Sequence, residues 1–168
     1  GDGIALIRAH EAAAAGDLDE LVRIDGLIHA RKLSAETRTM SVRMGKKFAE
    51  MGAEVIGAPL LRAWRDRIES GATRGCYPVA LGLNFAVQGL PERDAFVVHQ
   101  YGVASMILSA ALRLMKISHV DTQRILYRLD AGADAADKTG AAARLCDIVG
   151  FALLAVCLEA GQIRADVC

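Results

Sequence analysis

The sequence predicts an all-α protein, a single-domain bundle of about eight helices, and three observations lead to this prediction. The chain of 168 residues contains only 3 prolines and 5% aromatic residues, whereas strands are rich in aromatic and β-branched side chains. Apolar residues make up 53% of the chain and recur at helical spacings of three, four and seven residues. No linker rich in Pro or Ser and no internal repeat interrupts the sequence, so residues 1–168 are expected to form one domain.

The first two predicted helices are separated by a short turn. The first helix runs from Ile4 to Ala15 and ends at Gly16, a residue typical of helix C-termini. Asp17 is then expected to be the N-cap of the second helix, with Glu20 three residues later as in a capping box. The second helix is amphipathic, with apolar residues at Leu18, Leu21, Val22, Leu27 and Ile28.

Ser34 is expected to cap the third predicted helix, which runs to about Met51. Met40, Met44, Phe48 and Met51 fall on one stripe of this helix. The same region is the most basic part of the chain, with Arg31, Lys32, Arg38, Arg43, Lys46 and Lys47. These cations indicate either a solvated face or a contact surface for an acidic protein partner.

Prolines and glycines delimit the next two helices. Pro59 suits the first turn of a fourth helix, whose buried side is Leu60, Leu61, Trp64 and Ile68. Trp64 is the only tryptophan, and we expect it to pack in the core. Tyr77-Pro78 opens a fifth helix over 79–87, and Gly89-Leu90-Pro91 ends it.

The sixth helix is predicted from a run of about 18 uncharged residues between Asp94 and Arg113, which reaches the lower bound for a membrane span. Polar residues within the run and the lack of a basic cluster after it favour a buried central helix instead. A membrane-embedded helical protein is therefore only an alternative interpretation.

Two further helices complete the prediction. Ser118 and Asp121 have the spacing of a capping box and start the seventh helix, which the segment 131–134 is expected to interrupt or fray. The eighth helix covers 139–162 and is apolar on almost all sides between Ile148 and Leu158.

Composition and motifs exclude several classes of function. Twenty basic and 20 acidic residues give a net charge of zero and a pI near 7.1, which argues against a nucleic-acid partner. The sequence contains no phosphate-binding loop and no nucleophile elbow. The four histidines are too far apart in sequence for a helical metal site, and the carboxylate pairs lie at helix ends. We therefore expect no enzymatic activity, no metal site and no cofactor, and interpret the chain as an interaction protein.

The cysteines indicate a reducing compartment. Cys76, Cys146, Cys157 and Cys168 form no CxxC pair, and a chain of this size does not need disulfides. No basic stretch leads into an apolar segment at the N-terminus, so no secretory signal is expected. Together these features predict a cytoplasmic protein with reduced thiols.

Several segments resemble the urease accessory protein UreF family. Residues 30–45, ARKLSAETRTMSVRMG, resemble the family's signature ending in Met-Gly. Residues 108–114 and 122–126 resemble its segment in which a small-residue helix ends in a basic residue and a Gln-Arg pair opens the next helix. Residues 77–82 and 90–95 fit the intervening helices, and the order agrees over most of the chain.

The resemblance implies a non-enzymatic scaffold for urease maturation. Such a protein bridges UreD, also called UreH, and the GTPase UreG, so that nickel is delivered to apo-urease. It also implies a homodimer. The zero net charge and the polar residues of the sixth predicted helix, not the resemblance, predict that the chain binds neither nucleic acid nor membrane. The sequence is expected to lack the N-terminal portion and the C-terminal tail of the family.

Seven residues are candidates for partner binding. Ser34, Arg38, Ser41 and Gly45 are spaced at i, i+4, i+7 and i+11 and share one helical face, which suits either a partner helix or internal packing. Arg113, Gln123 and Arg124 surround one turn and form either a polar contact patch or a local capping cluster.

One alternative from a different class remains. Arg113, His119 and Tyr127 could line a pocket, which would make the chain a helical small-ligand-binding protein or an enzyme.

Overall fold

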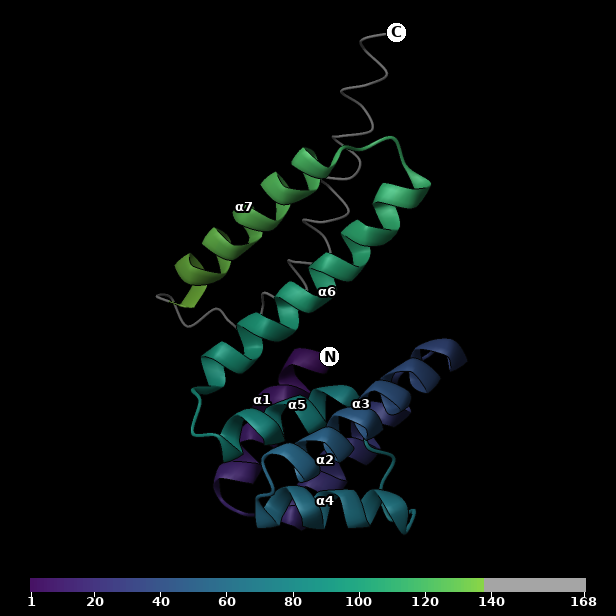
Figure 1. Cartoon of the computed structure of the whole chain (residues 1–168), viewed down its shortest axis with the longest axis vertical. Helices are drawn as coiled ribbons and strands as arrows, with labels where there is room; N and C mark the ends of the chain where they lie inside the picture. Colours follow the sequence, from purple (N-terminus) through teal and green to yellow (C-terminus); the bar gives the residue numbers. More distant parts are fainter. Residues whose placement is uncertain (138–168) are drawn as a thin grey trace, which may run out of the picture. The chain divides into compact units, whose positions relative to one another are not determined.

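The chain folds into helices joined by short turns, and the fold class predicted from the sequence is confirmed. The computed structural model describes residues 1–137, and this part of the chain contains seven helices and no strand (Figure 1). In order, the helices are α1 (Asp2–Ala14), α2 (Leu18–Arg31), α3 (Ala35–Val55), α4 (Pro59–Glu69), α5 (Tyr77–Val87), α6 (Glu92–Leu114) and α7 (His119–Asp137). They correspond one by one to the first seven predicted helices. The predicted eighth helix, 139–162, lies outside the described residues, as do Cys146, Cys157 and Cys168.

By its internal contacts, the chain divides into two compact units, Gly1–Phe96 and Val97–Cys168. The first unit contains α1 to α5 and the first turn of α6. The structure describes residues 97–137 of the second unit, which comprise the rest of α6 and α7.

The predicted helix caps are present at three helix starts. The Asp17 carboxylate accepts the backbone N–H of Glu20 at 2.9 Å, and Ser34 Oγ accepts that of Thr37 at 3.4 Å. Ser118 Oγ accepts the N–H of Asp121 at 3.2 Å, while the Asp121 carboxylate accepts the N–H of Ser118 at 3.1 Å, so this pair forms a complete capping box. These side chains satisfy N–H groups that have no partner within the helix.

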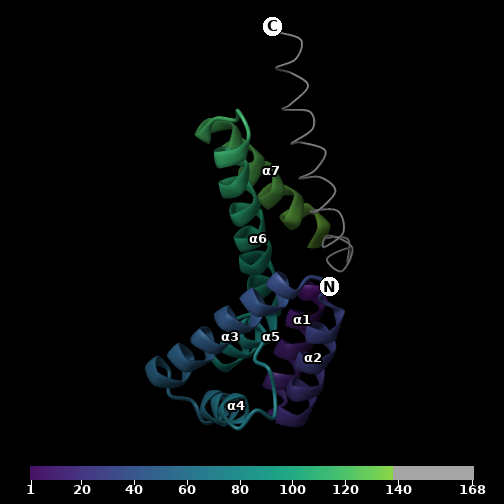
Figure 2. The same ribbon diagram turned by 90° about the vertical axis from the view of Figure 1, so that its right-hand side faces the viewer.

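Helix α5 occupies the centre of the first unit, between α1 and α3 (Figures 1 and 2). Gly82 permits the close contact with α1, because a Cβ at this position would lie 2.5 Å from the carbonyl oxygen of Leu6. α2 packs against α1, and α4 contacts α2, α3 and α5. The core of this unit includes Leu21, Leu61, Trp64, Val79 and Leu83, all fully buried. Trp64 therefore packs in the core, as predicted.

A partly buried ion pair connects the start of α1 to the end of α2. Lys32 Nζ lies 2.7 Å from a carboxylate oxygen of Asp2, and only 7% of the lysine side chain is exposed. A buried ammonium group needs such a partner, because the loss of its hydration is costly. Lys32 is one of the cations of the basic segment identified in the sequence, and this pair makes it unavailable for binding a partner.

Two details of the second unit differ from the sequence predictions. α6 is not buried on all sides, since Val98, Tyr101 and Met106 are 47%, 52% and 53% exposed. Its length and apolar composition would allow α6 to span a membrane, but core helices of soluble proteins meet the same criterion. Of its most apolar stretch of 18 residues, 33% is buried. α7 continues through residues 131–134, where we expected an interruption. Three of these four residues are alanine or aspartate, which a helix accepts at low cost, and one internal glycine costs only about 1 kcal/mol.

Candidate protein-binding surfaces

Ser34 and Arg38 organise the connection between α2 and α3. Ser34 caps α3 and also donates its hydroxyl hydrogen to the Glu36 carboxylate at 2.6 Å. This hydrogen bond lowers the pKa of Glu36. The Arg38 guanidinium donates to the backbone carbonyl of Lys32 and, at 3.4 Å, to that of Leu33. Arg38 therefore satisfies carbonyl groups at the C-terminus of α2, where a positive charge is also favoured by the helix dipole.

Ser41 and Gly45 lie on the buried side of α3. A Cβ at Gly45 would lie 2.6 Å from the backbone nitrogen of Tyr77 and would also overlap the carbonyl oxygen of Gly75. Ser41 Oγ accepts the N–H of Tyr77 at 3.4 Å. The same face continues with Gly52, which contacts the side chain of Asn84 on α5. Internal packing, one of the two interpretations offered by the sequence, thus accounts for these two positions.

Asp25 fixes the loop that receives Gly45, and the sequence analysis missed it. This fully buried carboxylate accepts four hydrogen bonds. They come from the Thr73 hydroxyl at 2.6 Å and from the backbone N–H groups of Arg74, Gly75 and Cys76 at 2.8, 2.9 and 2.6 Å. A signal for it existed, because Asp25 falls on the buried side of α2, next to Ile24 and one turn from Leu21. A buried carboxylate is stable only when donors surround it in this way.

Cys76 lies at the end of this loop as a free, buried thiol. Burial, together with the negative charge of Asp25, raises the pKa of Cys76 to about 12. The thiol therefore stays protonated at neutral pH and is a poor nucleophile and metal ligand. Cys76 therefore serves as a small residue of the core.

The remaining three candidates lie on either side of the turn between α6 and α7. Arg113, at the end of α6, is exposed and donates to the carbonyl of Ser109 at 3.3 Å. Gln123 and Arg124 are exposed on the first turns of α7. The Arg124 side chain is 71% exposed, and its ion pair with Asp121 spans 3.6 Å.

The α6–α7 turn carries a net positive charge. We define the α6–α7 patch by its exposed polar residues Arg113, Lys116, His119, Gln123, Arg124 and Arg128. Asp121 is the only acidic residue within 113–128. Four Lys and Arg side chains against one carboxylate suit an acidic protein surface.

The seven candidates thus form two separate groups. The first four lie in the unit Gly1–Phe96 and the last three in the second unit. Within the first group, Ser41 and Gly45 are covered by the chain itself, and Arg38 is half-buried. In the second group, the side chains of Arg113, Gln123 and Arg124 are all exposed.

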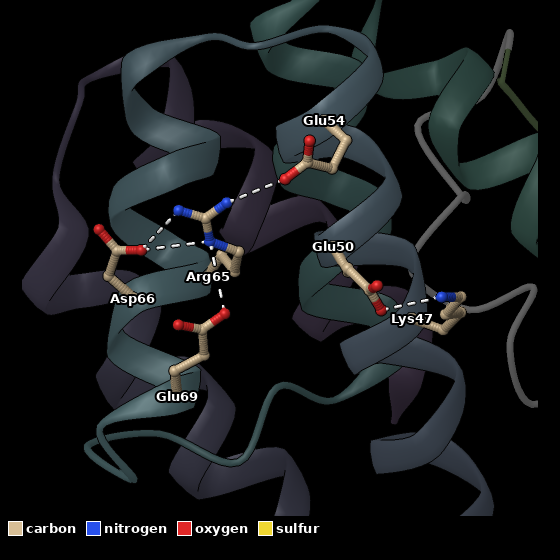
Figure 3. A network of polar contacts seen from close by, with 6 residues as sticks. All are labelled: Lys47, Glu50, Glu54, Arg65, Asp66 and Glu69. Atoms are coloured by element: carbon tan, nitrogen blue, oxygen red, sulfur yellow. Dashed lines mark hydrogen bonds and ion pairs between the residues drawn. The ribbon is translucent and has the colours of Figure 1, made fainter.

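Charged residues between α3 and α4 form a local network (Figure 3). The Arg65 guanidinium lies 3.3 Å from Glu54, 3.0 Å from Asp66 and 3.5 Å from Glu69. These carboxylates raise the pKa of Arg65, with the hydrogen bond to Asp66 as the main cause. Because the carboxylates are exposed, the network holds α4 beside α3 only weakly. Within residues 1–137, no group of three or more His, Cys, Asp or Glu side chains is arranged to hold a metal ion.

Comparison with known proteins agrees with the resemblance seen in the sequence. The UreF family model matches residues 1–130. Urease accessory proteins UreF from Yersinia enterocolitica serotype O:8, Yersinia pseudotuberculosis serotype IB and Yersinia pestis strain Pestoides F are each 47% identical over 129 residues. These matches cover 77% of this chain and 57% of each relative, so the chain spans less than two thirds of their length. No solved structure matches the chain.

The match extends from α1 into α7 and includes both groups of candidate residues. The relatives are named as accessory proteins of urease, a non-enzymatic class, in line with the prediction that the chain is not an enzyme. This chain belongs to the UreF family of urease accessory proteins.

Proposed function

We propose that this chain acts as a non-enzymatic scaffold in urease maturation, bridging UreD (UreH) and the GTPase UreG so that nickel reaches apo-urease. Membership of the UreF family supports the general role. The observation that carries the bridging proposal is the exposed, positively charged α6–α7 patch, whose Arg124 side chain is 71% exposed.

The chemistry of the patch suits recognition of a protein surface. An arginine presents several donors in a fixed plane and matches a carboxylate with two parallel hydrogen bonds. The ion pair between Arg124 and Asp121 is long and exposed, so exchanging it for a partner's carboxylate costs little. Gln123, beside Arg124, adds both a donor and an acceptor.

The remaining parts of the proposal concern assembly and location. We propose that the protein forms a homodimer and works in the cytoplasm, where UreD, UreG and apo-urease are its partners. In this proposal, Ser34 and Arg38 contribute at the α2–α3 connection, while Ser41 and Gly45 act indirectly by holding α3 in place.

Co-expression with UreD and UreG of the same organism, followed by size-exclusion chromatography, tests this function. We expect the three proteins to elute together. Arg124→Ala and Arg113→Ala are expected to weaken capture of a partner at least about tenfold, while the helical circular dichroism stays unchanged.

Arg8→Ala provides a matched control. Arg8 lies on α1 in the other unit, is 66% exposed and pairs with Glu11 three residues away, as Arg124 pairs with Asp121. Separate elution of all three proteins in the presence of nickel and GTP contradicts the function. An equal effect of Arg8→Ala and Arg124→Ala contradicts the assignment to the α6–α7 patch.

The alternative of a small-ligand site is not favoured by the side chains concerned. Arg113 and His119 are exposed, and 78% of the Tyr127 surface is accessible. Small-molecule sites bury most of the ligand surface, which needs an enclosed arrangement.

A further inference from the structure

Helix α7 has one exposed face on which apolar and polar side chains alternate. We call the α7 face the set Val120, Gln123, Arg124, Tyr127 and Arg128, which are spaced at i, i+3, i+4, i+7 and i+8 and therefore share one side of the helix. All five side chains are exposed, Val120 to 59% and Tyr127 to 78%. Three of the five also belong to the α6–α7 patch, so the face adds two apolar groups to that positively charged surface.

The α7 face has a fixed orientation. On the opposite side of the helix, Thr122, Ile125 and Leu126 are buried. The capping box of Ser118 and Asp121 holds the first turn in place. A face held at its start and along its back loses little conformational freedom when a partner binds to it.

The residue types of the α7 face are those that contribute most to protein–protein binding. Tyr and Arg are enriched among interface residues whose truncation is most costly, and a tyrosine ring offers a large contact area with few rotatable bonds. Tyr127 lies one turn from both Gln123 and Arg124, and Arg128 follows it directly. The ring is thus an apolar centre with hydrogen-bonding groups on its sides, as in the core and rim of an interface.

The charge of this surface is positive. Among residues 1–137, Arg128 forms no ion pair, and the pair of Arg124 with Asp121 spans 3.6 Å. Asp121 is the only acidic residue within 113–128, whereas Arg113, Lys116, Arg124 and Arg128 supply four positive charges. This excess favours carboxylates on the surface that covers the face.

A second copy of the chain fits the α7 face less well. Arg124 is the middle residue of the face. In a two-fold contact centred there, Arg124 meets its own counterpart, which brings like charges together.

A lipid surface fits less well for a different reason. Val120 and Tyr127 alternate with Gln123 and Arg124 on the same side of α7. Inserting the two apolar side chains below the lipid headgroups would draw the polar ones in with them, and burying polar groups without partners is costly.

We propose that the α7 face binds an acidic segment of a partner protein. Apolar side chains of that segment cover Val120 and Tyr127, and its carboxylates pair with Arg124 and Arg128. Tyr127 is the apolar anchor, while the two arginines select for negative charge. This inference rests on the proposed function and deepens it, because it states the chemistry of the partner's surface and assigns binding energy to two further residues.

Capture of UreD and UreG by the full chain at low and high salt, about 50 and about 500 mM NaCl, tests the proposal. Tyr127→Ala is expected to lower the affinity at least about tenfold at both salt concentrations, because the lost contact is apolar. Arg128→Ala is expected to lower it at low salt and to make binding less dependent on salt, because the lost contact is ionic. Tyr127→Phe keeps the ring and is expected to bind like the parent chain.

Tyr101→Ala is the matched control. Tyr101 is 52% exposed on α6, in the same unit but outside the α7 face. Capture by Tyr127→Ala as tight as by the parent chain, or an equal loss in Tyr101→Ala, contradicts the role of the α7 face and leaves the proposed function intact. Failure of the parent chain to capture either protein contradicts the proposed function, and the α7 face is then decided by a probe that needs neither protein.

That probe is a synthetic acetylated helical peptide of about 18 residues, with leucines along one side and glutamates flanking them. The matched peptide has lysines in place of the glutamates. The full chain is labelled with ¹³C in the rings of its 3 tyrosines. We expect the acidic peptide to shift the Tyr127 signals in a saturable way, to leave those of Tyr101 unchanged, and to bind at least about tenfold more tightly than the lysine peptide.

Equal shifts at Tyr101 and Tyr127, no saturable shift at Tyr127, or equal binding of the two peptides would overturn the proposal. So would Tyr127 shifts that grow with the concentration of the chain alone, since the occupant would then be a second copy. Larger Tyr127 shifts with phosphatidylserine vesicles than with the acidic peptide would assign the face to a lipid surface instead.

Discussion

The carboxylate of Asp25 accepts the backbone N–H of Cys76 at 2.6 Å, across 51 positions of sequence. This bond, with the three others that Asp25 accepts from residues 73–75, fixes the loop against which Gly45 packs. The position of α3 on α5 therefore depends on one side chain of α2.

Asp25→Asn is expected to lower the free energy of unfolding by about 3 kcal/mol. The amide oxygen cannot accept all four hydrogen bonds, and the amide NH₂ group would be buried against N–H and O–H groups that are themselves donors. Urea unfolding followed by circular dichroism measures this change. Asp19→Asn is the control, since the Asp19 side chain is 88% exposed and is expected to change stability by less than about 0.5 kcal/mol. Equal effects of the two substitutions would show that the loop does not depend on Asp25.

Gly45→Ala is expected to destabilise the fold by about 2 kcal/mol or more, because the added methyl group meets backbone atoms of residues 75–77 that cannot rotate away. Gly26→Ala in α2 is the matched control, since nothing lies within 4 Å of a Cβ there. Alanine is expected to stabilise that position by up to about 1 kcal/mol. A neutral Gly45→Ala would mean that α3 does not approach the loop so closely.

Ser118→Ala is expected to weaken the start of α7 by about 1 kcal/mol, because it removes the hydroxyl that accepts the N–H of Asp121. Faster hydrogen exchange over the first turn of α7 measures the loss. Ser109→Ala, inside α6 towards its C-terminal end, caps no helix and serves as the control. Unchanged exchange in Ser118→Ala would show that the capping box does not hold this helix end.

The raised pKa of Cys76 predicts a loss of stability at high pH. Between the ordinary thiol pKa of 9.0 and about 12, the unfolded chain releases this proton while the folded chain keeps it. The free energy of unfolding therefore falls as pH rises through this window, and below it the contribution is fully present. Cys76→Ala is expected to show a shallower fall in urea unfolding from pH 8 to 11. Identical pH profiles for the two proteins would contradict this assignment.

The helices were predictable because their signals are local. Pro59, Ser118 and Asp17 act on residues within one turn of themselves, so their effects can be derived without knowing the fold. The family could be identified from the sequence for a similar reason, since its motifs are short segments in a fixed order.

The roles of individual residues were less predictable, because they depend on neighbours distant in sequence. The sequence showed that Ser41 and Gly45 share a face, but not that residues 75–77 cover it. It placed Met40 and Met44 on an apolar stripe, yet they are 51% and 47% exposed, because which side of an amphipathic helix is buried depends on how closely its neighbours approach. Asp25 was missed because its four donors lie about fifty residues away.

The burial of Trp64 makes the molecule's intrinsic fluorescence selective. As the only tryptophan, it reports melting of Gly1–Phe96, whereas far-ultraviolet ellipticity sums over helices of both units. If the two units melt separately, the two optical signals will trace different transitions in the same sample.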